Sequence, residues 1–293
     1  MTKETGEYMN TSRTQPTVVV TGAAGYIGRH VVTALLERGF AVRAVVRPGR
    51  GGGVDARATL VEADLFASET DLDAVLGDST QALIHLAWQD GFKHNARSHM
   101  HNVSRHFDFV TGASSRIPRV AVLGTLHEVG YWEGAITAET PTNPRSQYGI
   151  AKDALRRSLL LEPVDGQELV WLRCYYIVGD DRQSNSIFTR LLEAVDAGQT
   201  TLPFTSGVNK YDFIDVDELA AQIAVAATTP GIVGVLNCSS GDPVSLAEKV
   251  ESFIRDEQLP ISLAYGAFPD RAYDSPAVWG DSTEIKRIMA GSV

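Results

Sequence analysis

The chain has 293 residues, with 26 lysines and arginines against 36 aspartates and glutamates, so its formal net charge is −10. Hydrophobic residues make up 44% of the chain and charged residues 21%, which excludes disorder as the main state and is ordinary for a globular protein. The acidic balance argues against a general binder of nucleic acids or of anionic membranes. This length is sufficient for one large or two small domains with a buried core.

Cysteine content and the polar first residues bear on cellular location. Cys174 and Cys238, the only cysteines, lie in apolar stretches outside any metal-ligand pattern, so we expect buried thiols, no metal site and a reducing cytoplasm. Residues 1–15 are polar and lack a signal-peptide core, and we expect a flexible leader there. The uncharged run 219–236 contains Gln, Thr, Pro and Gly, so we expect no membrane span.

Strand and helix patterns alternate along the first part of the chain. Short apolar or β-branched runs predict strands at 17–21, 41–46, 58–62, 82–86, 120–123 and 169–172. Helical patterns fall between most of them, at 27–38, 72–76, 94–113 and 148–161. This alternation predicts an α/β fold, a doubly wound parallel sheet with helices on both faces.

The pattern loosens after residue 173. It predicts helices at 185–197, 216–227 and 246–256 and a strand at 234–237, followed by a tail punctuated by Pro and Gly. We therefore expect two units, 16–173 and a smaller C-terminal lobe over 174–293. Parts of 211–238 are expected to return to the sheet of the first unit.

A glycine-rich turn follows the first predicted strand and opens the first helix, with the sequence Thr-Gly-Ala-Ala-Gly-Tyr-Ile-Gly at 21–28. Glycines permit a tight turn and the close approach of a pyrophosphate. The free N–H groups and the positive dipole end of the helix would hold that anion. We therefore expect a Rossmann-like dinucleotide site that includes Gly22, Gly25, Tyr26, Ile27 and Gly28.

The end of the second predicted strand bears on which dinucleotide binds. A site for NAD usually has an acidic residue there, about 20 residues after the glycines, to hold the ribose 2′-hydroxyl. This chain has Arg47, with Arg43 and Arg50 nearby. Because an arginine can bind a 2′-phosphate through paired hydrogen bonds, we expect NADPH, with NADH as the alternative.

Tyr148 and Lys152 lie four residues apart, on one face of a predicted helix. An ammonium and an oxidised nicotinamide nearby favour the phenolate of a tyrosine whose free pKa is near 10, so its hydroxyl could exchange a proton near neutral pH. A hydroxyl at the end of the fifth strand would complete the group by hydrogen bonding a substrate carbonyl, and Thr125 lies there. We predict Thr125, Tyr148 and Lys152 as the catalytic residues, and a structural role for His85.

The glycine spacing G-x-x-G-x-x-G, together with Tyr-x-x-x-Lys, resembles the short-chain dehydrogenase/reductase superfamily over almost the whole chain. The resemblance implies further cofactor contacts from Asp64 and Leu65 after the third strand and from Leu86 and Ala87 after the fourth. It also suggests Asn102 as the additional helix asparagine that some members use.

The second half resembles the extended members of this superfamily, the NAD-dependent epimerases and dehydratases that act on nucleotide-sugars. Residues 173–179 are similar to their R-x-x-N-V-Y-G segment, 210–217 to R-D-F-x-x-V-x-D and 237–241 to N-x-x-S-G. The resemblance implies Tyr175 as a further cofactor contact. It implies substrate-binding roles for His127, Asn185, Lys210 and Arg271, the last at the usual place of a diphosphate-binding arginine.

Two segments narrow the resemblance further. Residues 124–134 and 265–280 are similar to dTDP-4-keto-6-deoxyhexose 4-ketoreductases. A 4,6-dehydratase carries Thr-Asp-Glu, whereas Leu126 and His127 follow Thr125 here, so only the glutamate remains, as Glu128. The arginine after strand two suits an NADPH that is released and spent stoichiometrically.

We therefore predict NADPH-dependent reduction of the C4 carbonyl of a nucleotide-activated 4-keto-6-deoxyhexose, with dTDP as the nucleotide, in deoxysugar biosynthesis. The alternatives are a nucleotide-sugar 4-epimerase and a non-catalytic NADP-binding sensor, which would lack turnover. The resemblance also implies a homodimer formed through the helix after strand four and the catalytic helix.

Overall fold

A computed structural model of the chain describes residues 15–67, 70–179, 182, 184, 186–270 and 274–292. The predicted leader, apart from Gln15, lies outside these residues. Two predicted substrate contacts, Asn185 and Arg271, also lie outside them.

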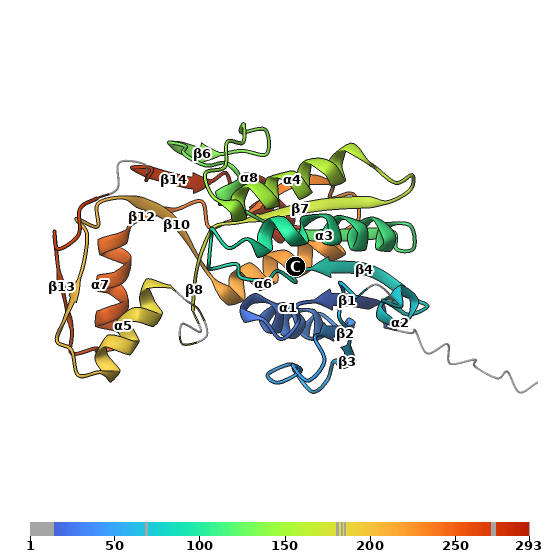
Figure 1. The fold of residues 1–293 in the computed structure, drawn as a ribbon, viewed down its shortest axis with the longest axis horizontal. Coiled ribbons are helices and arrows are strands. Elements are labelled where there is room, and N and C mark those ends of the chain that lie inside the picture. Colours follow the sequence, from blue (N-terminus) through green and yellow to red (C-terminus); the bar gives the residue numbers. More distant parts are fainter. Residues whose placement is uncertain are drawn as a thin grey trace, which may run out of the picture.

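A seven-stranded parallel sheet forms the centre of the larger part of the molecule (Figure 1). Its order is β11-β7-β5-β4-β1-β2-β3, and all neighbouring pairs are parallel. The strand order reverses between β1 and β4: β2 and β3 follow on one side of β1, and β4, β5, β7 and β11 follow on the other. Doubly wound sheets bind ligands at such a point. This confirms the predicted fold class. The strands are β1 (Thr17–Thr21), β2 (Ala41–Val46), β3 (Thr59–Glu62), β4 (Thr80–His85), β5 (Arg119–Thr125), β7 (Glu168–Cys174) and β11 (Gly234–Cys238).

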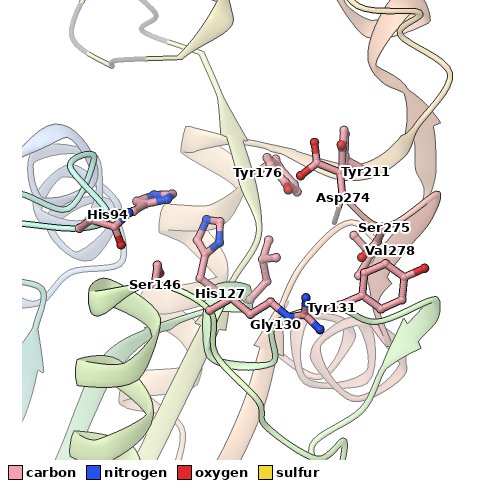
Figure 2. Close-up of a pocket in the computed structure, with 13 residues that line it drawn as sticks. His94, His127, Gly130, Tyr131, Ser146, Tyr176, Tyr211, Asp274, Ser275 and Val278 are labelled. Carbon is pink, nitrogen blue, oxygen red and sulfur yellow. The ribbon is translucent and has the colours of Figure 1, made fainter. Parts of the chain in front are cut away.

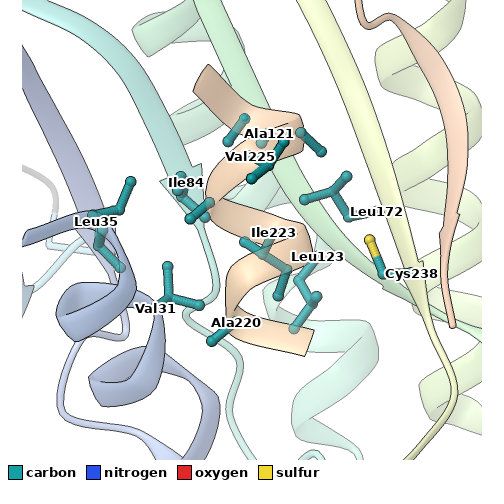
Figure 3. Packing of buried hydrophobic residues seen from close by; sticks show 14 of the residues in the cluster. Val31, Leu35, Ile84, Ala121, Leu123, Leu172, Ala220, Ile223, Val225 and Cys238 are labelled. Atoms are coloured by element: carbon teal, nitrogen blue, oxygen red, sulfur yellow. The ribbon is translucent and has the colours of Figure 1, made fainter. Parts of the chain in front are cut away.

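Helices bury both faces of this sheet, which explains why its strands are apolar on both sides. One face is covered by α1 (Tyr26–Glu37), α6 (Val216–Thr228) and α8 (Thr283–Ala290). The other is covered by α2 (Leu72–Leu76), α3 (Ser98–Ser114) and α4 (Gln147–Leu161). Figure 3 shows Val31 and Leu35 of α1 and Ala220 and Ile223 of α6 near the strand residue Ile84 in the first core.

The smaller lobe, at the left of Figure 1, is built on a five-stranded sheet with the order β12-β10-β14-β6, in which β8 also pairs with β10. Helices α5 (Ile187–Asp196) and α7 (Leu246–Asp256) enclose a separate core with the two-stranded sheet of β9 (Thr201–Pro203) and β13 (Ser262–Ala264). The five strands are β6 (Gly134–Ile136), β8 (Tyr176–Val178), β10 (Lys210–Asp215), β12 (Pro243–Ser245) and β14 (Ala277–Gly280).

A buried carboxylate fastens three distant segments together. Asp212 of β10 is fully buried and accepts hydrogen bonds from the backbone and hydroxyl of Ser240, from the Gly241 amide and from the Gly280 amide, all at 2.6–3.0 Å. Two of the segments that resemble the extended family, 210–217 and 237–241, therefore meet here. The buried polar groups of these segments are hydrogen bonded to one another, as is usual for buried polar groups.

Later parts of the chain return to the main sheet. β11 pairs with β7, α6 packs on α1, and α8 packs on α6 and β11. The expected unit boundary, between 173 and 174, falls inside β7, because Cys174 is the last residue of that strand. Within the described ranges, none of the helices combines the length and apolar character needed to cross a membrane.

Candidate active site

The glycine turn between β1 and α1 is packed so closely that side chains would not fit at two of its glycines. Gly22 has a φ of +70°, and a Cβ there would lie 2.7 Å from the Ala87 backbone nitrogen. A Cβ on Gly28 would lie 2.1 Å from the Gly22 carbonyl oxygen. Helix α1 has Gly25 as its N-cap, without a side-chain cap or an acidic residue in its first turn. A helix N-terminus of this kind fits the pyrophosphate of a dinucleotide.

Other residues expected at the cofactor support this turn. The Tyr26 hydroxyl donates a 2.5 Å hydrogen bond to the Gly179 carbonyl, which ties the turn to the segment after β8. Ile27 and Leu86 are partly buried against the first core. The Ala87 amide donates to the Thr21 hydroxyl at 3.4 Å. The structure thus brings the ends of β1 and β4 together at the glycine turn.

The residues expected at the adenosine end follow β2 and β3. Arg47 is exposed directly after β2. Arg43 instead donates to two backbone carbonyls of α2. The Asp64 carboxylate closes its own turn by accepting from the Phe66 amide at 3.0 Å, and Leu65 packs against the second core. Of the arginines in this region, Arg47 thus remains the candidate for a cofactor contact.

The three predicted catalytic residues converge at the carboxyl end of β5. Thr125 is the last residue of β5, and Tyr148 and Lys152 lie one turn apart on α4, which Ser146 caps. The Lys152 Nζ donates a 2.7 Å hydrogen bond to the Leu123 carbonyl, which fixes α4 against β5. The Thr125 hydroxyl lies close enough to the Tyr148 hydroxyl to lower its pKa.

Burial sets the protonation of this group. Burial raises the pKa of Tyr148, Cys174 raises it further, and the nearby Thr125 hydroxyl opposes the rise. Burial lowers the pKa of Lys152 to about 8, so the ammonium form predominates at neutral pH. The lowering of the Tyr148 pKa by Lys152 that the sequence predicts is not among the causes acting on this tyrosine, of which burial is the largest.

A cavity of about 700 Å³ lies where the catalytic end of the sheet meets the smaller lobe. Figure 2 shows His94, His127 and Ser146 on one side of it and Tyr176 and Tyr211 on the other. His127 therefore lies where a substrate contact was expected. Lys210 is exposed at the start of β10 and does not line this cavity. The lining is completed by Asn95, Leu126, Gly130, Tyr131, Arg145, Asp274, Ser275 and Val278.

His94 is a site residue that sequence reasoning missed. Its ring stacks on Tyr148 at 5.5 Å between ring centres and lies 4.4 Å from the ring of His127. Burial lowers the pKa of His127 to about 4 and also lowers that of His94. Both rings are therefore neutral near pH 7 and can each donate and accept a hydrogen bond. The predicted helix over 94–113 begins only at Ser98, which leaves His94 in a loop.

Glu128, the remaining acid of the dehydratase pattern, does not line the cavity. Its fully buried carboxylate accepts hydrogen bonds from the Thr125 amide at 3.0 Å and from the Trp171 indole at 2.9 Å. Arg156 lies 2.8 Å and Arg173 3.5 Å from its oxygens. Glu128 therefore holds the end of β5 in place and is not positioned to contact a substrate in the cavity.

Three more expected residues have structural partners. The Tyr175 hydroxyl donates to Asn237 at 3.1 Å inside a buried cluster at the junction with the lobe. Asn102 donates to Gln89 at 3.2 Å. His85 is buried, and its Nδ1 lies 2.8 Å from the Thr21 hydroxyl. Both cysteines are buried and unpaired, and the described residues contain no cluster of three His, Cys, Asp or Glu that could hold a metal ion.

Comparison with known proteins places this site in a family. Residues 18–238 match the NAD dependent epimerase/dehydratase family. The chain belongs to this family. It is 44% identical over 267 residues to the dTDP-6-deoxy-L-talose 4-dehydrogenase (NAD(+)) of Aggregatibacter actinomycetemcomitans, covering 90% of this chain and 98% of that protein. The predicted resemblance and the prediction of a nicotinamide-dependent oxidoreductase are confirmed.

Solved structures share the fold across nearly the whole chain. The UDP-N-acetylglucosamine 4-epimerase of Methanobrevibacter ruminantium M1 matches with a TM-score of 0.80 and 21% identity, covering 94% of this chain and 92% of that one. DesIV, a dTDP-glucose 4,6-dehydratase from Streptomyces venezuelae, matches with a TM-score of 0.76 and 19% identity, covering 92% and 90%. At these identities the likeness concerns the fold.

Proposed function

We propose that this protein reduces the C4 carbonyl of a dTDP-activated 4-keto-6-deoxyhexose. The observation that carries the proposal is the convergence of Thr125, Tyr148 and Lys152 at the carboxyl end of β5, where their chain neighbours Leu126, His127 and Ser146 line the cavity. The name of the 44% identical relative supports it, because that protein is a 4-dehydrogenase of a dTDP-6-deoxyhexose. Reduction and oxidation at C4 are one reaction in two directions.

In this proposal, Thr125, Tyr148 and Lys152 have different roles in the transfer of one proton. A bound reduced nicotinamide supplies the hydride. Thr125 holds the substrate oxygen by a hydrogen bond, and Tyr148 gives its hydroxyl proton to the alkoxide that forms. The ammonium of Lys152 would hold the nicotinamide ribose, and the positive charge of an oxidised nicotinamide would favour the tyrosinate that remains after proton transfer. General acid catalysis of this kind contributes about 10²- to 10⁴-fold.

We infer NADPH as the preferred cofactor from the exposed Arg47 after β2, since a guanidinium pairs well with a phosphate. The name of the relative specifies NAD(+). An acidic side chain also lies near Arg47, because Glu62 at the end of β3 accepts a 3.1 Å hydrogen bond from the Gly49 amide. A direct comparison of NADPH and NADH therefore decides the cofactor.

The cavity supplies the substrate contacts in this proposal. His127 and the neighbouring His94 face the hexose, because they lie beside Tyr148 and offer neutral donors and acceptors. Arg145, which lines the same cavity, adds a cation. We retain Asn185, Lys210 and Arg271 as substrate contacts on the family resemblance, with the two cations assigned to the diphosphate, which Lys210 would meet outside the cavity lining.

The test is incubation with NADPH and a dTDP-4-keto-6-deoxyhexose, with absorbance at 340 nm and NMR of the product at C4. One NADPH consumed per sugar, with a new C4–H, supports the ketoreductase. A C4 epimer of a nucleotide-sugar formed without net NADPH loss indicates a 4-epimerase. Cofactor binding without turnover of any keto-sugar nucleotide indicates a sensor. The Tyr148→Phe variant is the control for background chemistry.

We also propose a homodimer formed through α3 and α4. Met100 on α3 and Ile150 on α4 are 42% and 40% exposed, and Leu161 at the end of α4 is 83% exposed. Apolar side chains gathered on two adjacent helices are typical of an interface. Light scattering should give a mass of twice the 31.7 kDa of one chain. The Ile150→Asp variant should give the mass of a single chain. A wild-type monomer contradicts this proposal.

A further inference from the structure

The indole of Trp88 lies against the Lys152 side chain. Trp88 follows β4, and the centre of its ring is 3.9 Å from the Lys152 Nζ. Lys152 is only 3% exposed, and among the described residues no carboxylate forms an ion pair with it. The Nζ atom contacts the Leu123 carbonyl and the Trp88 indole face, and a second indole, that of Trp171, lies farther away at 5.9 Å. A desolvated ammonium gains substantial stabilisation from such a face.

Two histidines fix the orientation of this indole. The Trp88 Nε1–H donates to the His99 Nδ1 at 3.0 Å, and the His99 Nε2 lies 3.0 Å from the Lys93 carbonyl. Since Nδ1 is the acceptor, Nε2 carries the proton and donates to that carbonyl. His106 stacks on the indole at 4.3 Å between ring centres and at 11° between ring planes. The indole is thus held at its edge and on its face.

The stacked histidine is itself anchored to the end of β1. His106 Nδ1 lies 2.9 Å from His85 Nε2, and His85 Nδ1 lies 2.8 Å from the Thr21 hydroxyl. Burial lowers the pKa of His85 to about 3 and lowers the pKa of His106 still further. Both imidazoles are therefore neutral, and neither adds a positive charge that would repel the Lys152 ammonium.

We propose that Trp88 is a positioning residue for Lys152: its indole face, fixed by His99 and His106, holds the side-chain nitrogen in place and keeps it charged. The role of Lys152 in the reaction rests on the proposed function, whereas the contact does not. In this arrangement, Thr21, His85, His106 and Trp88 link the strand that carries the glycine turn to the catalytic lysine.

NMR of protein labelled with ¹³C at the lysine ε-carbon tests this directly, without substrate or turnover. The chain has six lysines, and the signal lost in Lys152→Met identifies the resonance. An indole face at 3.9 Å should shift the Lys152 methylene protons upfield. In Trp88→Leu this shift should disappear, and the pKa of Lys152 should fall by about one pH unit, or about 1.4 kcal/mol.

Two variants guard against a trivial loss of folding. Trp88→Phe keeps a smaller aromatic face and should show an intermediate pKa, which a purely space-filling role would not produce. Trp132→Phe, whose indole donates to Ala135 instead, should leave the Lys152 signal unchanged. The titration must be fitted with the other groups around Lys152, namely Tyr148 of α4, Glu128, Cys174 of β7, His85 of β4 and His106 of α3.

An unchanged Lys152 pKa in both Trp88 variants would overturn the proposal, as would a wild-type spectrum without the upfield shift. If the proposed function also holds, the alkaline limb of kcat should move to lower pH in Trp88→Leu by the same amount as the Lys152 titration. A shifted Lys152 titration in a protein that turns over no keto-sugar would leave this inference intact and remove the proposed function instead.

Discussion

The Lys152 Nζ reaches across from α4 and donates a 2.7 Å hydrogen bond to the carbonyl of Leu123, two residues before Thr125. This bond joins α4, which carries Tyr148, to the strand that presents the Thr125 hydroxyl. The relative position of Thr125 and Tyr148 is therefore set by the protein, which is the preorganisation that the proposed proton transfer requires.

Removal of the Tyr148 hydroxyl should abolish most turnover. Tyr148→Phe leaves the ring and its stacking on His94 nearly intact, so we expect cofactor binding close to that of the wild type. Without the proton donor, kcat should fall by about 10²- to 10⁴-fold. Stopped-flow measurement of NADPH oxidation, together with calorimetry of cofactor binding, checks both statements. Near-normal turnover would remove Tyr148 from the mechanism.

Thr125 can be tested with a matched pair of variants. Its hydroxyl also accepts from the His127 amide at 3.3 Å, and serine retains this bond whereas alanine does not. We expect Thr125→Ser to keep most of the activity and Thr125→Ala to lose less than Tyr148→Phe, because water can replace a hydroxyl that only orients a carbonyl. Equal rates for the serine and alanine variants would contradict the role assigned to the hydroxyl.

Arg47 should decide between the two cofactors. Loss of a charge-assisted hydrogen bond costs about 1.5–3 kcal/mol, so Arg47→Asp should weaken NADPH binding about ten- to a hundredfold and shift the preference toward NADH. Arg50→Asp, in the same exposed turn, is the control. If the wild type binds NADH as tightly as NADPH, the inference from Arg47 fails.

The proposed diphosphate contacts should affect KM more than kcat. Arg271→Ala and Lys210→Ala should each raise the KM for the nucleotide-sugar, because these contacts bind ground and transition states alike. Arg38→Ala, at the far end of α1 from the glycine turn, serves as the surface control. Steady-state kinetics with varied nucleotide-sugar gives the answer, and an unchanged KM would withdraw the assignment.

Glu128 should matter for stability. Its carboxylate is fully buried between Arg156 and Arg173. In Glu128→Gln, Arg156 keeps its ion pair with Asp153, whereas the fully buried Arg173 loses its carboxylate partner. Breaking a buried pair in this way costs about 3–5 kcal/mol, which urea unfolding should detect. Glu37→Gln, at the exposed end of α1, should cause little change. Equal unfolding midpoints for the two variants would contradict the role of Glu128.

Acid should destabilise the protein through its buried histidines. The pKa of His85 and of His106 is lowered by burial, so the unfolded chain binds more protons below about pH 6.5, the ordinary histidine value. The free energy of unfolding should therefore decrease as pH falls from about 6.5 toward 4, by roughly 1 kcal/mol per pH unit for each buried histidine. Urea unfolding at pH 7 and 5 measures this. His106→Gln should flatten the slope, and the exposed His101→Gln on the same helix should not.

The main sheet, the glycine turn and the candidate residues Thr125, Tyr148 and Lys152 could be predicted from the sequence alone, because each depends on short-range signals. Valine-rich runs such as 17–21 and the spacing of Tyr148 and Lys152 are local patterns, and they remain visible whatever the rest of the chain does. The short strands of the lobe and helix α8 were not predicted. Strands of three or four residues such as β6 and β14 are too brief to show a period, and they form because they pair with each other.

The surroundings of Tyr148 and Lys152 could not be predicted from the sequence and became visible only in the folded chain. His94 contacts it from a loop 54 positions earlier in the chain, and Trp88 reaches Lys152 from the end of β4. Glu128 looked like the remainder of a catalytic acid pair, yet Arg156 and Arg173 draw its carboxylate into the interior. Local sequence carries no record of these contacts, because they depend on how β4, β5, β7 and α4 pack side by side.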